Sequence, residues 1–449
     1  MVTARHFQSS ESLSSFFKVS NSFMFNTFLA LILLVFHLTL HSQTTFAPLD
    51  PAYTSIIDHF EIQYGSKAPY LFSSVKPYTR KSIAHFAETL LADTTIRLSQ
   101  VEKSNLKYLL NDNWEYEKQF QNTHTNSSFT SPTFSSLAHQ HNFRSIDTIN
   151  QVQSNSIQAT NNNFLSHFYT HPNALYAVQE KGFNFQINPV LNFEGGKDIV
   201  GPNATTNSNS TTNSISINTR GFELRGTIDN KVSFYSMLTD NQVFFPAYVQ
   251  QRINSTGVVP GNGFWTPFKS DGYDFYSALG YIDFNLTRHI NFQFGQDKNF
   301  IGEGIRSLEL SDYSAPYLFA KISTKIWRFD YENTFAEMVA DGLSSGGDVN
   351  VPRKYMAMHY LSYKFSSNFA LGLFESVTFG NTDSIHERGF DLNYLNPLIF
   401  YKAVENGLGA PDKDHIGIDF KWKLYHRLSL YGTIFLDEFN LAEIKANSG

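Results

Sequence analysis

The dominant pattern in this chain is an alternation of apolar and polar residues with a period of two, which begins near residue 182. In the segment Ile416–Leu424 every second residue is apolar, and the residues between include Asp419, Lys421 and Lys423. The segment Ile290–Phe294 alternates in the same way. Because successive side chains of a strand point to opposite faces, the pattern predicts β-strands with one apolar and one polar face.

The same interpretation predicts further strands, some with less regular alternation. They are Phe183–Phe193, Ile215–Ile228, Val232–Leu238, Tyr273–Leu286, Phe319–Trp327, Phe329–Val339, Tyr355–Phe365, Phe369–Phe379 and Leu428–Leu436. The links Lys364–Asn368 and Tyr425–Arg427 have hairpin length, whereas Phe244–Gly272 and Gly342–Arg353 are long and rich in Gly, Pro and Asp. Short turns at one end and long loops at the other are typical of outer-membrane β-barrels.

A β-propeller or a large β-sandwich also contains alternating strands, so these soluble folds are alternatives. Two features favour the membrane. The predicted strands of 10 to 12 residues match a tilted membrane crossing and exceed the usual length of about five or six. Aromatic residues also gather at strand ends, for example Tyr273, Phe275 and Tyr276, as an interfacial girdle requires. We therefore predict an all-β fold, an antiparallel transmembrane outer-membrane β-barrel over residues 182–449, in the cell outer membrane.

Residues 43–118 carry a different pattern, which predicts short helices. Apolar residues from Ile83 to Leu91 recur with the spacing of one buried helical face, and Pro77 precedes them. Ser99 and Glu102 have capping-box spacing at the start of a second helix. Two short helices do not make a stable domain, so we expect them to pack on something larger, with Arg80 facing solvent.

Two segments flank this helical part. Phe28–Leu40 is a 13-residue apolar run that is too short to span a bilayer, and Ser42 lies before the expected cleavage point. Residues 1–42 are therefore predicted to be a signal peptide. Residues 119–181 are predicted to be a polar linker and lead-in, because 119–163 is rich in Ser, Thr, Asn, Gln and His and has no periodicity.

Composition agrees with a membrane barrel and excludes several classes. Aromatic and charged residues each make up 16% of the chain, and the charged fraction is well under the roughly 25% of soluble domains. The formal net charge is −6, and without a basic stripe we expect no nucleic-acid partner. The chain has no cysteine, which excludes disulfides, thiolate zinc sites and thiol nucleophiles.

Two dense polar segments supply the candidate site. The first, Gly295–Tyr317, contains Asp297, Asn299, Glu303 and Arg306, and the second, His386–His415, contains Arg388, Asn393 and Glu405. Both mix many charges with aromatic residues, so we expect these seven side chains to form one polar cluster inside the barrel, since lipid could not satisfy them. The cluster is either an internal charge network or a ligand site for a sugar.

Catalytic and cofactor motifs are absent from the sequence. Gly302-Glu303-Gly304 lacks the downstream residues of a phosphate loop or a dinucleotide fingerprint. His139 and His141 have no third ligand, and no Gly-x-Ser-x-Gly elbow occurs. A hydrolase could use dispersed residues such as Ser307 and His359, but their spacing does not favour it. We expect no catalysis, no cofactor and no metal.

Four stretches resemble a known family. They are GQDKNFIGEGIRSLELSDYSAPY (295–317), KYMAMHYLS (354–362), RGFDLNYLNPLIFYKAVE (388–405) and YGTIFLDEFNLAEIK (431–445). The chain from about residue 50 onward resembles the outer-membrane barrel family of gliding-motility RemB and, more distantly, capsule-assembly Wzi-type proteins. The resemblance implies a barrel with its helical segment, 43–118, on the periplasmic side. Wzi-type members act like surface lectins that hold capsular polysaccharide, and RemB-like members accompany surface motility.

The expected function is therefore non-catalytic: assembly or attachment of surface polysaccharide, or gliding motility. The expected partners are outer-membrane lipid, surface polysaccharide, and other motility or envelope proteins. The alternative is a passive diffusion porin. A porin would keep an open lumen, whereas the lumen of an anchor would be plugged by inward loops and the N-terminal helices. The chain ends NLAEIKANSG without a terminal aromatic strand, and the family continues further, so we expect an incomplete barrel.

Overall fold

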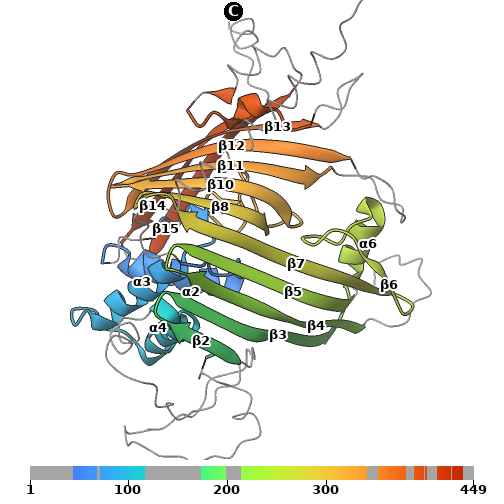
Figure 1. Cartoon of the computed structure of the whole chain (residues 1–449), viewed down its shortest axis with the longest axis horizontal. Coiled ribbons are helices and arrows are strands. Elements are labelled where there is room, and N and C mark those ends of the chain that lie inside the picture. The colour runs from blue at the N-terminus through green and yellow to red at the C-terminus, as the bar shows by residue number, and fades with distance from the viewer. Residues whose placement is uncertain are drawn as a thin grey trace, which may run out of the picture.

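The computed structural model describes residues 44–67, 71–116, 173–198, 214–340, 352–380, 389–398, 400–401, 412–425 and 427–437. Within these ranges, thirteen strands form one sheet in the order β15-β14-β13-β12-β11-β10-β8-β7-β5-β4-β3-β2, with β6 paired to β7 (Figure 1). The strand pairs are antiparallel, and neighbours in space follow chain order. An all-β antiparallel architecture, as predicted from the alternation, is confirmed.

The strand bounds are close to the predicted ones. They are β2 (Tyr176–Glu180), β3 (Phe183–Lys197), β4 (Ser214–Ile228), β5 (Val232–Phe244), β6 (Thr266–Phe268), β7 (Gly272–Asn285), β8 (Ile290–Asp297), β10 (Tyr317–Ile326), β11 (Phe329–Val339), β12 (Arg353–Lys364), β13 (Phe369–Gly380), β14 (Lys413–Leu424) and β15 (Leu428–Asp437). Strand β2 lies in the predicted lead-in and β6 in the predicted long link Phe244–Gly272, and neither was expected. The predicted signal peptide, residues 1–42, and residues 119–172 of the linker lie outside the described residues.

Connections alternate in length along the sheet. The β4–β5, β7–β8, β10–β11, β12–β13 and β14–β15 links are short, and Asp229 and Asn230 both have positive φ angles, 53° and 52°, as a tight hairpin turn requires. The links that leave the opposite ends of these strands are long, and one contains helix α6 (Ala247–Thr256). We call the two ends of the sheet the short-turn end and the long-loop end.

The two faces of the sheet have opposite character. On the inner face, which contacts the N-terminal residues, charged side chains such as Asp419 (2% exposed) and Lys421 (8%) are buried. On the outer face, the alternating apolar residues of β14 are exposed, with Ile418 at 43% and Trp422 at 47%. The predicted division of β14 into an apolar and a polar face is confirmed, and its polar face is the buried one.

The described N-terminal residues, 44–67 and 71–116, form a helical unit with its own core; we call it the N-terminal segment. It contains α2 (Pro51–Tyr64), the two-residue strand β1 (Val75–Lys76), α3 (Arg80–Ala92), α4 (Gln100–Asp112) and the short helix η1 (Trp114–Tyr116). The predicted helices are confirmed as α3 and α4, including the Ser99–Glu102 capping box. Helix α2 was not predicted, and the expectation that Arg80 faces solvent is wrong, because Arg80 is 1% exposed.

The N-terminal segment lies against the inner face at the short-turn end (Figure 1). The hydroxyl of Ser233, near the start of β5, donates to the carbonyl of Thr44 at 3.1 Å, and Lys364, at the end of β12, donates to the carbonyl of Leu71. None of the helices in the described ranges has the length and hydropathy to cross a membrane.

Candidate functional site

The first predicted polar segment lies on the inner side of the sheet. Residues 298–316, which we call the inward loop, leave the long-loop end of β8 and return to β10. Its strand β9 (Phe300–Ile301) pairs with β1 of the N-terminal segment, with Val75 opposite Ile301. The ladder is extended by the amide of Gly302, which donates to the carbonyl of Ser74 at 2.8 Å. The loop therefore meets the N-terminal segment inside the curved sheet.

Three of the predicted site residues lie there, and two of them, Asn299 and Glu303, make buried contacts. Lys321 of β10 donates to the side-chain oxygen of Asn299 at 2.9 Å, and Glu303 accepts from Ser73 at 3.1 Å. Asp297 ends β8 and accepts from the amide of Lys298 at 2.7 Å. Sequence reasoning found these residues because their segment is dense in charge although it follows a strand.

The other predicted residues do not join them. Arg306 is exposed, and its guanidinium stacks over the ring of Tyr313 at 4.7 Å. Asn393 is exposed and hydrogen-bonds only within its own turn, to Asp391, among the contacts described. Arg388 and Glu405 lie outside the described residues. The described members of the predicted set therefore do not form the single cluster expected.

Part of the second polar segment covers the outer face instead of lining the interior. Its residues 389–398 and 400–401 form what we call the cover segment. Tyr394 packs on Phe379 with ring centroids 5.1 Å apart, and Tyr401 stacks on His359 at 4.1 Å. His359 points to the face opposite its neighbour Tyr360, whose hydroxyl lies on the inner side near Asp419. A polar segment can thus be satisfied on the outside because it buries aromatic rings against strands β11 to β13.

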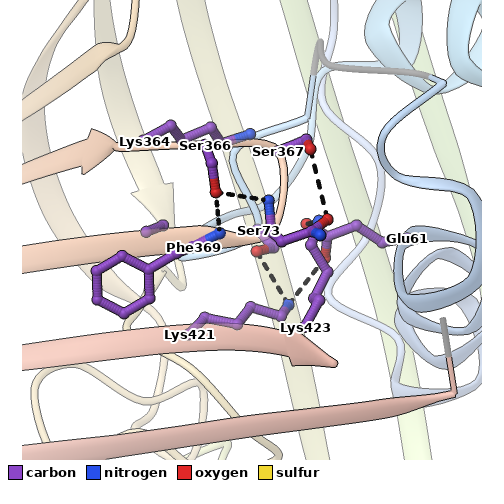
Figure 2. A pocket seen from close by; sticks show the side chains of 10 residues that line it. Glu61, Ser73, Lys364, Ser366, Ser367, Phe369, Lys421 and Lys423 are labelled. Carbon is purple, nitrogen blue, oxygen red and sulfur yellow. Dashed lines mark hydrogen bonds and ion pairs between the residues drawn. The ribbon is translucent and has the colours of Figure 1, made fainter. Parts of the chain in front are cut away.

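Sequence reasoning missed the most strongly charged contact between helix and sheet. Glu61 of α2 is 5% exposed and pairs with two lysines of β14, at 2.8 Å from Lys421 Nζ and 3.3 Å from Lys423 Nζ. Lys421 also contacts Glu303 at 3.1 Å and Ser73 at 3.0 Å. One lysine of the sheet therefore joins the N-terminal segment to the inward loop, and Figure 2 shows its contacts with Glu61 and Ser73.

Electrostatics fix the charge of this contact. Burial alone would raise the pKa of Glu61, but the ammonium groups of Lys421 and Lys423 outweigh it and hold the pKa at about 2. Burial raises the pKa of Glu303, which Lys421 only partly offsets. Glu61 is therefore the carboxylate that stays ionised under all ordinary conditions. We call Glu61, Ser73, Glu303, Lys421 and Lys423 the lysine–glutamate cluster.

A small pocket opens beside the cluster at the short-turn end (Figure 2). It is lined by Glu61, Ser73, Lys364, Ser366, Ser367, Asn368, Phe369, Ala370, Lys421 and Lys423. The ammonium of Lys364 lies 4.3 Å above the ring of Phe72. Gly65 leaves room for Lys423, since a side chain at position 65 would begin 2.8 Å from the Lys423 ammonium.

A second buried ion network fixes the other side of the N-terminal segment. Arg80 donates to Asp112 at 2.8 Å, and Arg225 of β4 lies 3.2 Å from Glu115 and 3.4 Å from Glu223. Burial would raise the pKa of Asp112, but Arg80 and Arg225 outweigh it and lower it. Both guanidinium groups are almost fully buried, so they depend on their carboxylate partners, and the Arg225–Glu115 pair is the one that links the segment to the sheet.

Two of the sites considered from the sequence, a metal site and a Ser–His pair, are not formed by the described residues. No group of three or more His, Cys, Asp or Glu side chains is placed to hold a metal ion in the part of the chain described. Ser307 donates to the carbonyl of Ile301 on the inner side, whereas His359 is on the outer side. These two residues, the dispersed hydrolase pair considered from the sequence, therefore do not meet.

The arrangement is thus a sheet with an apolar outer face and a charged inner face. The N-terminal segment and the inward loop lie against the inner face, where lysine and arginine side chains of the sheet bind them. Comparisons with known proteins add no family to this description. No protein-family model matches the chain, and no curated protein matches it in sequence.

Proposed function

We propose that the chain is an outer-membrane β-barrel that serves the cell surface without catalysis, in the assembly or attachment of surface polysaccharide or in gliding motility. The proposal rests on one observation above all, the inverted burial of the strands. In β14 the charged residues Asp419 and Lys421 are buried, while the apolar residues that alternate with them, from Ile416 to Trp422, are 36% to 47% exposed. In water this arrangement would be unfavourable twice over. Burying the charged side chains costs free energy, and leaving the apolar side chains exposed loses the stabilisation that their burial would give.

A lipid environment removes this conflict. The outer face continues its apolar character across the sheet, with Leu191, Phe222, Ile282 and Phe294 all more than 40% exposed. Monomeric soluble proteins seldom expose apolar surface on this scale. Alternating short and long connections agree with periplasmic turns and extracellular loops. The short-turn end, with the helices, would then be periplasmic, and residues 1–42 would be the export signal.

Closure of the barrel is part of the proposal. Strands β2 and β15 lie at the two ends of the described strand order. Hydrocarbon does not tolerate unpaired strand edges. In the membrane these two edges would therefore pair with each other or with further strands.

The filled inner side favours an anchor over a porin. The N-terminal segment enters from the short-turn end, the inward loop enters from the long-loop end, and Ser73 and Glu303 connect them. Two buried ion networks fix the N-terminal segment to the sheet. A diffusion porin needs a continuous aqueous path, which this filling opposes. The resemblance to RemB and Wzi-type barrels supports the roles in polysaccharide attachment and motility.

Planar-bilayer recording of the full-length protein tests the plugged barrel. We expect no large, steady single-channel currents. Such currents would establish the porin alternative and overturn the anchor. Two further measurements compare cells with and without the protein. They are the amount of polysaccharide kept on the cell surface and the rate of colony spreading. Loss of surface polysaccharide would identify a role in attachment, and loss of spreading would identify a role in motility. If neither changes, the proposed surface function is wrong.

A further inference from the structure

The pocket beside the lysine–glutamate cluster has an excess of positive charge. Its lining includes three ammonium groups, Lys364, Lys421 and Lys423, and one carboxylate, Glu61. Glu303 lies on Lys421 at 3.1 Å and is not part of the lining. Glu303 and Asp58 both attract Lys421 from outside the lining, so the excess of positive charge belongs to the lining itself. Asp330, the next acidic group near Lys364, is paired with Lys325 at 3.3 Å.

The charge is held in place by the fold. The side chains of Lys421 and Lys423 are only 9% and 11% exposed. Lys364 is fixed by the carbonyl of Leu71 and the ring of Phe72. Three long, flexible side chains are therefore already ordered around one opening, so a ligand would not have to meet the entropy cost of ordering them.

The lysines at this opening keep hydrogen-bond donors beyond those used in the contacts described. An ammonium group has three donors, and Lys423 uses one on Glu61 and Lys364 uses one on Leu71 in the contacts described. The β12–β13 turn adds the side chains of Ser367 and Asn368 to the lining, with the Ser367 hydroxyl donating to Asn368 Oδ1 at 3.4 Å. Figure 2 shows Lys364 and the turn on one side, and Lys421 and Lys423 on the other.

We propose that this pocket binds a phosphate group. A phosphate has several acceptor oxygens and one or two negative charges, which match the spare donors and the charge excess of the pocket. Lysine ammonium groups commonly bind phosphate as point charges. The pocket lies at the short-turn end, so the phosphate can belong to a phospholipid headgroup or be free in solution. The inference depends on side-chain contacts alone and does not require the proposed surface function.

The test is ligand-dependent thermal stabilisation of the purified full-length protein in detergent. We expect inorganic phosphate to raise Tm by several degrees over sodium chloride at equal ionic strength. Lys423→Gln should abolish this phosphate-dependent rise, whereas Lys103→Gln, an equal charge change on the exposed face of α4, should keep it. Each variant is compared with itself without phosphate, so a change in its basal Tm does not affect the result.

A second pair of variants avoids the buried lysines. Ser367 is exposed on the turn, so Ser367→Asp should fold normally while placing a carboxylate at the rim. We expect it to weaken phosphate binding about tenfold or more, and Ser367→Asn, the uncharged control, to weaken it far less. No phosphate-specific rise in the wild-type protein, or equal rises in wild type, Lys423→Gln and Ser367→Asp, would overturn the proposal.

Short-chain lipids distinguish the two sources of the phosphate, a lipid headgroup and free phosphate. If dihexanoyl phosphatidylglycerol stabilises the wild type but not Lys423→Gln, and dihexanoyl phosphatidylcholine has no such effect, the pocket accepts an anionic lipid headgroup. If only inorganic phosphate does so, the pocket takes a free phosphate. Both results support a phosphate site.

Discussion

At the scale of single residues, Glu61 has the largest consequence, because two buried lysines share it. Glu61→Gln would leave Lys421 and Lys423 with much less compensation for their lost hydration. Removing one member of a buried ion pair costs about 3 to 5 kcal/mol. We expect a loss near 3 kcal/mol in the free energy of unfolding by urea, since Glu303 and Ser73 remain. Glu180→Gln, an equal change at an exposed position, should have little effect.

The same residue makes a prediction for acid conditions. The pKa of Glu61 is about 2 in the folded protein and 4.5 without the fold. Its contribution is therefore fully present above about pH 4.5 and is lost as the pH falls toward 2, and it amounts to at most about 3 kcal/mol. Unfolding curves between pH 6 and 3 should show a smaller acid loss for Glu61→Gln than for wild type. Parallel curves would contradict the assignment.

Glu309 of the inward loop predicts the opposite dependence. Burial and the neighbouring carboxylate of Asp419 raise the pKa of Glu309 to about 9. Folding therefore requires a proton that the unfolded chain releases above about pH 4.5, so stability falls as the pH rises through this range. Glu309→Gln keeps a hydrogen-bond donor for Asp419 without the titration. We expect it to raise the urea midpoint at pH 8 to 9 and to leave it unchanged near pH 4.

Residue-level prediction from the sequence succeeded only where charge was locally dense. Asn299 and Glu303 were expected in a polar interior because their segment combines charges with a strand end. Arg306 belongs to the same segment but is exposed, and only the path of the loop decides this. Glu61 and Arg80 carried no local signal, since a single charge on an amphipathic helix is normally solvated.

At the scale of elements, the apolar face of β14 separates a membrane strand from a soluble one. Ile418 lies at the middle of the strand and is 43% exposed. In a soluble protein Ile418→Arg would be mild, but near the bilayer midplane it costs about 2 to 4 kcal/mol. We expect Ile418→Arg to reduce the folded, heat-modifiable fraction in the outer membrane. Equal assembly of wild type and variant would argue for a soluble sheet.

The matched control for this substitution is Ile305→Arg. Ile305 is 86% exposed on the inward loop, away from the outer face, so the same change there should leave assembly intact. Asp419→Arg is unsuitable as a control, because the Asp419 side chain packs directly over Gly372. An arginine there would fail for steric reasons that say nothing about lipid.

Elements differ in how well the sequence predicts them, and the reason is the range of the interactions. Strand β11 was predicted to the residue, since alternation is local and a tight turn links it to β10. The cover segment was predicted to lie inside the barrel, because lipid could not satisfy its charged side chains. It lies outside because Tyr394 and Tyr401 find aromatic partners on β12 and β13, and that pairing is tertiary.

At the scale of the whole molecule, the defining contacts join residues hundreds of positions apart. Glu61 and Lys421 are separated by 360 residues, and Ser73 and Glu303 by 230. No periodicity in the sequence encodes such partners. The expectation that the helices pack on something larger was general; their position against the inner face comes from the structure.

This docking predicts a specific cross-link. The chain has no cysteine, so a double variant, Val75→Cys with Ile301→Cys, carries only the introduced pair. The two residues are directly opposite in an antiparallel ladder, where Cβ atoms are about 4.5 to 5.5 Å apart and a small shift permits a disulfide. We expect mild oxidation of the membrane-assembled protein to cross-link nearly all molecules, seen as faster migration in non-reducing gels.

Urea before oxidation should abolish the effect. Val75→Cys with Ile326→Cys, whose second residue is 47% exposed on the outer face, should stay uncross-linked. If both pairs behave alike, the N-terminal segment does not occupy the inner side in the membrane.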